Sequence, residues 1–386
     1  MVQARRRPVA PDQPQRQFEE QLQSSARAAP GLAGFAVLVA VAANLGLPLP
    51  GGYLAIDMLL VAIGFDLARS ADPSTRPTSD DGRWLKLYWL ALVGRIGAPV
   101  ALAVTLTAVY ENSTAPLSEA MLRAVLGAMT MTLNLFTIFG GAELPAIEHF
   151  WVIGIIAQFA LIAPILVTWG AKRIQRDQRA SALVGLAVGV AICRLGFAAY
   201  QTAAYESIAI NTFTRLDALL VGLAIGVAPT EALRRRFPPG AAAAAFAALL
   251  VLFLAAPVQT EQPTLSLGVL VPMCVALSAV ILASTAAGNL TGAVSATLDN
   301  QVLRWLGARA VSLYLWHQIF AYALEIGLVG PTETLTDWPG FIIFVIRLTF
   351  SLAAAATSYR YLELPALAAA QRLSQRSTSP QLIEPA

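Results

Sequence analysis

Charged residues are scarce in this chain. Only 13% of its 386 residues are Asp, Glu, Lys or Arg, against about 25% in an average soluble domain. Apolar residues make up 57%, and runs of about 20 apolar residues, the length that crosses a bilayer as a helix, recur along the sequence. This composition indicates an all-α polytopic membrane protein and leaves no stretch for a separate soluble catalytic domain.

Histidine and cysteine are rarer still, with two of each. Two histidines cannot build a His-rich metal site and no typical Cys/His spacing occurs, so we expect no bound metal and no bound cofactor. Cys193 and Cys274 lie inside apolar runs and are expected to pack as small side chains rather than to form a disulfide. Neither a Gly-rich phosphate loop nor a Gly-x-Ser-x-Gly nucleophile turn occurs, and no nucleic-acid partner is expected.

Basic residues cluster in alternate loops, and the positive-inside rule converts this pattern into a topology. Ten crossings with both termini in the cytoplasm satisfy it. The chain is expected to hold one transmembrane domain at 30–370 between disordered cytoplasmic tails at 1–29 and 371–386. The expected crossings are 31–46, 52–68, 87–109, 150–170, 181–200, 211–229, 241–258, 265–287, 305–328 and 340–358.

The apolar segment 120–139 does not fit as a further crossing. If it crossed fully, the loop that carries Lys172 and Arg173 would lie outside the cell, against the positive-inside rule. We therefore expect this segment to be re-entrant or buried in the bundle, where protein or a cavity can satisfy its backbone.

Ionisable side chains inside the apolar runs are the candidates for function, because a charge in hydrocarbon is costly. Helix geometry places Arg95 and His317 near mid-membrane and most of the others in the outer half, which predicts an inward-facing polar cavity. Arg194, Glu325 and Arg347 lie close to run ends or to each other and are expected to be structural. The remaining candidates are Asp57, His149, Arg215 and Asp217.

Each candidate also has a purely structural alternative. Asp57 could form an interhelical ion pair with Arg215 or Arg95 that only fixes packing. His149, beside Trp151 at an outer boundary, could be an interfacial anchor.

Five segments carry a family resemblance. Their order and spacing are similar to those of the membrane-bound acyltransferase-3 family, the O-acyltransferases of bacterial cell-surface glycans, over about residues 31–370. The segments are GGYLAIDMLLVAIGF from Gly51, HFWVIGIIAQFALIAPIL from His149, FTRLDALLVGLAIG from Phe213, LGARAVSLYLWHQIF from Leu306 and SYRYLELP from Ser358.

The resemblance implies a reaction, a location and a set of site residues. An acyl group would pass from cytoplasmic acyl-CoA to a glycan or glycolipid hydroxyl at the outer face of the bacterial inner membrane, where the lipid bilayer and a membrane protein partner would surround the chain. The expected catalytic residues are His317, Asp57 and His149. The expected substrate-binding residues are Asn44, Arg95, Trp151, Arg215, Asp217 and Trp316.

The first span departs from the family pattern. The family carries an Arg there and, eleven residues later, a His regarded as the catalytic base, whereas this chain has Ala33 and Asn44. A further family Glu falls on Ile156. Asn cannot accept a proton from a hydroxyl, so either His317, His149 or Asp57 replaces the base, or the chain does not catalyse transfer.

Two non-catalytic alternatives stay open. The chain could bind an acyl or glycolipid ligand, alone or as a subunit of an envelope-assembly complex. It could also translocate a lipid through the same cavity, although no inverted repeat supports a transporter.

Overall fold

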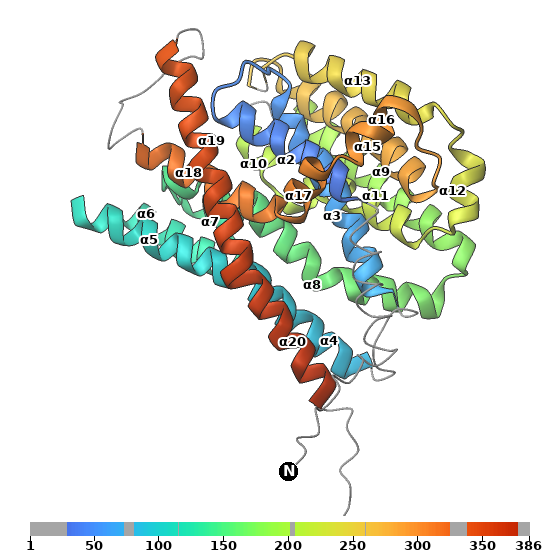
Figure 1. The fold of residues 1–386 in the computed structure, drawn as a ribbon, viewed down its shortest axis with the longest axis horizontal. Helices are drawn as coiled ribbons and strands as arrows, with labels where there is room; N and C mark the ends of the chain where they lie inside the picture. The colour runs from blue at the N-terminus through green and yellow to red at the C-terminus, as the bar shows by residue number, and fades with distance from the viewer. Residues whose placement is uncertain are drawn as a thin grey trace, which may run out of the picture.

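The computed structural model describes residues 29–72, 81–114, 116–200, 205–258, 260–324 and 338–376, and these contain helices and no strand (Figure 1). The expected tails lie outside these ranges, apart from Ala29 and residues 371–376, which belong to the last helix. The helices are α2 (Pro30–Asn44), α3 (Ala55–Ala71), α4 (Asp81–Leu92), α5 (Ala98–Thr114), α6 (Glu119–Met129), α7 (Leu133–Gly140), α8 (Phe150–Arg173), α9 (Arg176–Tyr200), α10 (Tyr205–Ala209), α11 (Thr212–Val227), α12 (Thr230–Arg236), α13 (Ala241–Ala255), α14 (Pro263–Leu265), α15 (Val271–Ala286), α16 (Gly292–Leu298), α17 (Gln301–Ala308), α18 (Ala310–Leu324), α19 (Trp338–Ser358) and α20 (Leu364–Arg376).

The described helices confirm a multi-pass membrane architecture but support fewer crossings than ten. Six are long and apolar enough to cross a bilayer, and a seventh results if α12 and α13, which meet at a bend of 73°, count as one span. The other three expected crossings fall on α2, α3 and α18, whose described parts have 15, 17 and 15 residues and are shorter than the six long spans. The six long spans are Asp81–Ser113, Phe150–Arg173, Gln178–Tyr200, Ser207–Val227, Pro263–Ala286 and Trp338–Ala370.

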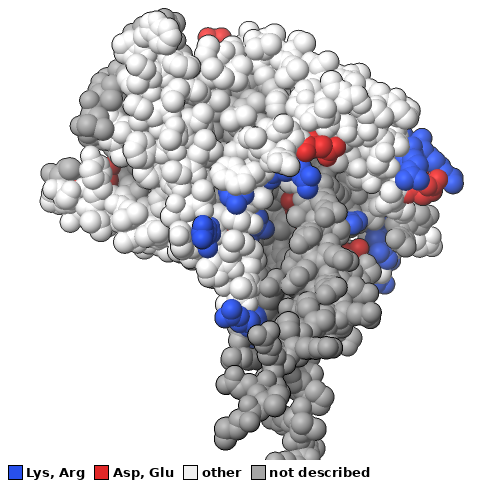
Figure 2. All heavy atoms as spheres, viewed as in Figure 1, with Lys and Arg blue, Asp and Glu red and all other residues white. Residues whose placement is uncertain are grey.

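The surface of the bundle fits a lipid environment. Large apolar side chains such as Val109, Ile192 and Phe350 are exposed on α5, α9 and α19. In Figure 2 the Lys and Arg residues in view gather along the lower part and at the right-hand edge, where Figure 1 shows α12, and the upper part is almost free of them. The exposed apolar side chains are therefore the surface that hydrocarbon covers.

Helix α3 forms the centre of the bundle, packed against α2, α8, α11 and α15. It meets α11 backbone to backbone: a Cβ at Gly222 would lie 2.0 Å from the carbonyl oxygen of Val61, and one at Gly64 would lie 2.2 Å from that of Leu219. Small residues permit this close approach between membrane helices. The glycines of the first and third family segments therefore have a packing role.

The segment 120–139 folds as a helical hairpin of α6 and α7. The two arms have 11 and 8 residues, or about 16 and 12 Å at the α-helical rise, which is shorter than the hydrocarbon core. The amide of Glu143 donates to the carbonyl of Ala120 at 3.3 Å, so the two ends of the hairpin meet. Membrane re-entry of this segment stays a prediction, and the hairpin geometry permits it.

Three π-helical turns interrupt the long helices. They lie at Val93–Gly97 between α4 and α5, at Ser266–Leu270 between α14 and α15, and at Tyr359–Glu363 between α19 and α20. Such turns shift the backbone hydrogen bonds and are frequent at functional sites. Each of the three lies beside a polar cluster described below.

Candidate active site

The end of α2 and the middle of α18 bring Asn44 and His317 together. Helix α2 stops after Asn44, and the chain turns at Gly46, whose φ of 106° favours glycine. The amide nitrogen Nδ2 of Asn44 lies 3.1 Å from Nε2 of His317. The Asn44 side chain is exposed, whereas His317 is completely buried beneath it.

The hydrogen bonds of His317 fix which ring nitrogen carries the proton. Nδ1 lies 2.6 Å from the carbonyl oxygen of Tyr314, and a carbonyl can only accept, so Nδ1 donates. In the neutral ring the lone pair is then on Nε2, where it accepts from the Asn44 amide. The basic nitrogen of His317 therefore faces Asn44.

His149 lies directly beside His317, so the two histidines of the chain form one cluster. It sits just before α8, its ring centroid is 4.9 Å from that of His317, and its Nε2 donates to the carbonyl of Leu315 at 2.9 Å. Its Nδ1 is buried and accepts no hydrogen bond from the described residues. The side chain is only 4% exposed, which does not fit an interfacial anchor.

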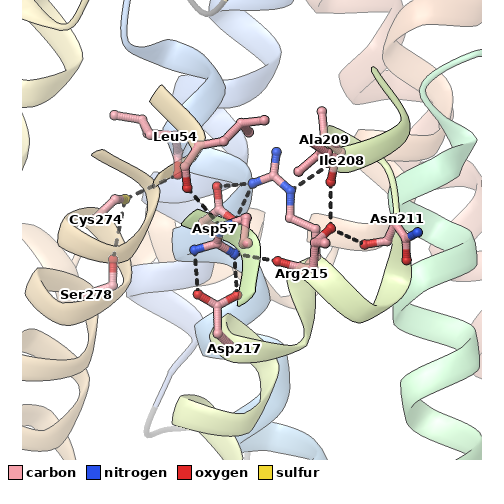
Figure 3. A network of polar contacts seen from close by, with 12 residues as sticks. Leu54, Asp57, Ile208, Ala209, Asn211, Arg215, Asp217, Cys274 and Ser278 are labelled. Atoms are coloured by element: carbon pink, nitrogen blue, oxygen red, sulfur yellow. Dashed lines mark hydrogen bonds and ion pairs between the residues drawn. The ribbon is translucent and has the colours of Figure 1, made fainter. Parts of the chain in front are cut away.

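Two buried ion pairs hold α11 to its neighbours and lie in one polar network (Figure 3). Nη1 of Arg215 donates to both carboxylate oxygens of Asp57 on α3, at 2.6 and 2.7 Å. Two residues further along, Asp217 accepts from Nη1 and Nη2 of Arg194 on α9, at 2.7 and 2.8 Å. Arg215 thus ties α11 to α3, and Asp217 ties it to α9.

Arg194, which the sequence analysis expected to be structural, forms a buried ion pair between two helices. It lies in α9, which ends at Tyr200 as expected, and its side chain is fully buried. Besides Asp217 it donates to the carbonyls of Leu267, at 2.8 Å, and Thr214. Leu267 belongs to the second π-helical turn, so Arg194 binds a carbonyl that this turn presents. The sequence signal that could have indicated this pair is an Arg inside one apolar run, Arg194, followed by an Asp inside the next, Asp217.

Arg95 pairs with a residue outside the candidate set and is not the partner of Asp57, and its expected role in substrate binding stays a prediction. Its side chain is 46% exposed, and its ion-pair partner is Glu363, with 3.7 Å between Nε and Oε2. Glu363 also accepts a hydrogen bond from the Ser312 hydroxyl. The first and third π-helical turns meet here, and the cluster joins the fourth and fifth family segments.

The two expected substrate-binding tryptophans differ in their surroundings. The Trp151 ring lies 5.6 Å from the guanidinium carbon of Arg215, a cation–π distance that connects the Asp57 pair to the start of α8. Trp316 is buried next to His317, and its indole nitrogen has no hydrogen-bond partner in the described part of the chain. The candidates thus form a histidine cluster under Asn44, the paired charges around α11, and a separate Arg95 cluster.

Comparison with known proteins identifies the family. A sequence model described as "Acyltransferase domain" matches residues 52–360, which is well over half of the chain, and the chain belongs to the acyltransferase-3 family. Ala33 and Asn44 precede the matched residues. No solved structure matches the chain.

Two curated relatives are peptidoglycan O-acetyltransferases by name. The chain is 24% identical to "Peptidoglycan O-acetyltransferase OatA" of Listeria monocytogenes over 356 residues, and 25% identical to "Putative peptidoglycan O-acetyltransferase YrhL" of Bacillus subtilis over 366 residues. Each match covers 87% of this chain and 54% of the relative. The chain therefore spans about half the length of the curated relatives it matches.

Proposed function

We propose that this chain is a membrane O-acyltransferase in which His317 replaces the missing first-span base. The observation that carries this proposal is the Asn44–His317 contact. The bond from Nδ1 to Tyr314 leaves the lone pair of His317 on Nε2, and Nε2 accepts from the amide of Asn44, a residue that is exposed at the surface. A hydroxyl that takes the place of the Asn44 amide reaches the basic nitrogen directly.

The proposed reaction uses this nitrogen as a general base. The acceptor hydroxyl gives its proton to Nε2 of His317 while its oxygen bonds to the acyl carbonyl carbon. The carbon–sulfur bond of the donor thioester then breaks, and the leaving thiolate takes the proton from Nε2. Acyl-CoA is the proposed donor, because the family reaction implies a thioester on the cytoplasmic side.

Asn44 and His149 have supporting roles in this proposal. The Asn44 amide cannot take a proton, but it can turn from Nε2 to the oxygen of the incoming hydroxyl and orient it. His149 packs against His317 and is held by Leu315, so it positions the ring that does the chemistry. Asp57 has both carboxylate oxygens occupied by Arg215, and we assign it to holding α3 and α11 together.

The proposed acceptor is a hydroxyl of a bacterial cell-envelope glycan. The names of the two relatives favour peptidoglycan as its chemical class. The alternating basic loops favour an inner-membrane location with both termini in the cytoplasm, so that the donor arrives from one side and the glycan from the other.

The proposal is tested with the full chain reconstituted in vesicles and given radiolabelled acetyl-CoA with peptidoglycan fragments or glycolipid. His317→Gln retains a hydrogen-bonding side chain but cannot act as base, and it should lower kcat about 10²–10⁴-fold. His149→Gln, the matched variant of the neighbouring ring, should lower kcat less. The reverse order would assign the base to His149 and refute the proposal.

A second candidate function is binding of an acyl or glycolipid ligand without catalysis. Two observations favour it. The Asn44 amide already donates a hydrogen bond to Nε2 of His317, the nitrogen that would act as base, and Ala33 supplies no charge to bind the phosphates of a donor. This reading predicts that the wild-type chain retains labelled acyl-CoA or glycolipid without turnover, and that Ala33→Arg combined with Asn44→His creates transfer activity. Turnover by the wild-type chain rules it out.

A further inference from the structure

An apolar groove opens on the side of the bundle formed by α9, α11 and α15, and α12 closes one end of it. Its volume is about 650 Å³, within the range of small-molecule sites. Ala, Val, Leu, Ile and Pro side chains make up most of its walls, and no residue of α2, α8 or α18 contributes. The groove is therefore separate from the Asn44–His317 cluster.

The length of the groove matches one leaflet of a bilayer. Its lining runs on α9 from Ala180 to Ala191, and on α11 from Asp217 to Ala228, the residue that follows the helix. Eleven residues of helix rise about 16 Å, which is about half of the 30 Å hydrocarbon core. Val184 and Val188 line the groove and are also exposed at the surface of the bundle, so the groove is open sideways to the surrounding lipid.

The two ends of the groove differ in charge. At the deep end, both carboxylate oxygens of Asp217 are bound by Arg194, so this pair leaves no free charge there. At the other end, Arg236 lines the opening. Its neighbours Arg234 and Arg235 pair with Glu231 at 3.8 and 3.2 Å, whereas Arg236 has no acidic partner among the residues that the structure describes.

We propose that this groove holds one acyl chain of an anionic phospholipid from the leaflet at α12, with the lipid phosphate on Arg236. The apolar walls fit hydrocarbon, the length fits one leaflet, and the unmatched guanidinium at the mouth complements a negative headgroup. The sideways opening lets the lipid enter from the bilayer. This site does not depend on the proposed acyl transfer.

The test measures the affinity of the first bound lipid by native mass spectrometry. The full chain is delipidated in detergent and titrated with phosphatidylglycerol or phosphatidylcholine that carry identical acyl chains. The wild-type chain should bind phosphatidylglycerol about fivefold more tightly than phosphatidylcholine, the factor that one arginine contributes near an anionic headgroup. Arg236→Gln should remove this preference, and Arg235→Gln, the matched change on the same helix, should keep it.

A second pair of variants tests the groove itself. Ala276→Phe fills the groove from α15 at an exposed position and should weaken both lipids, while Ala353→Phe, at an exposed position on α19, should weaken neither. If Ala276→Phe does not fold, the Arg236→Gln result still decides. Equal binding of the two lipids by the wild-type chain overturns the proposal. The proposal is also overturned if Ala276→Phe leaves phosphatidylglycerol binding unchanged. This holds even if Ala276→Phe abolishes acyl-CoA binding.

Discussion

Neutralising Asp217 should destabilise the bundle more than any change at a surface ion pair. Asp217→Asn conserves the size of the side chain but removes the charge that balances the fully buried Arg194. Two charge-assisted hydrogen bonds are affected, each worth about 1.5–3 kcal/mol, and breaking a buried pair by removing one partner typically costs about 3–5 kcal/mol. The Asn amide also turns N–H groups toward the guanidinium. We expect a loss of about 3–5 kcal/mol in the free energy of unfolding.

The measurement is reversible unfolding of the purified chain in mixed micelles with increasing SDS fraction. Lys172→Gln is the control, because it breaks a pair with Asp81 whose Lys side chain is 69% exposed, and it should cost at most about 1 kcal/mol. Arg194→Met combined with Asp217→Leu removes both charges and should cost less than Asp217→Asn alone. An Asp217→Asn variant as stable as Lys172→Gln would show that the two side chains do not pair in the membrane.

Three further outcomes follow from the packing and the topology. Gly222→Ala should lower the free energy of unfolding by about 1–3 kcal/mol through overpacking, because its Cβ would lie 2.0 Å from a backbone oxygen. Gly185→Ala is the control and should not destabilise, because its Cβ meets nothing within 4 Å. Equal losses of stability in the two variants would contradict the close contact at Gly222. Glu363→Ala should cost about 1–3 kcal/mol in the same assay, because a buried hydroxyl loses its acceptor; an unchanged stability would show that water satisfies it. In intact cells, a membrane-impermeant maleimide should label Ser113→Cys but not Gln175→Cys, and labelling of both or only the second would refute the proposed orientation.

The helical fold could be predicted from the sequence because the signal lies in each segment by itself. An apolar run of sufficient length forms a helix in hydrocarbon whatever its neighbours are, since its backbone must be satisfied within the segment. The number of membrane crossings was harder to predict from the sequence than the helical fold. Helix α2 ends at Asn44, before the end of the expected run at residue 46, because the chain turns at Gly46.

The partners of the buried charges could be predicted only in part. Counting residues from a helix end gives the depth of Asp57, but not the direction in which its side chain points around the bundle, so Arg215 and Arg95 were equal candidates. The structure selects Arg215 and pairs Arg95 with Glu363. Glu363 follows the last expected crossing, and its place in the fifth family segment did not indicate that its carboxylate would be buried.

The histidine cluster shows the same limit. His149 and His317 each stood in a family segment, but their separation in space depends on how the chain enters α8 and how α18 packs. The tautomer of His317 depends on a local carbonyl, that of Tyr314, which no spacing pattern reveals.

Helices α3 and α9 each carry a buried charge whose partner lies on α11, and the partners are synthesised at different times. Arg215 follows Asp57 by 158 residues, so at about 5–20 residues per second it leaves the ribosome about 8–30 s after its partner. Until then Asp57 lacks its Arg215 counter-ion, whereas Arg194 precedes Asp217 by only 23 residues and waits about 1–5 s for it at the same rate. An unpaired charge is costly in hydrocarbon, and α11 supplies the partners of both Asp57 and Arg194 when it inserts.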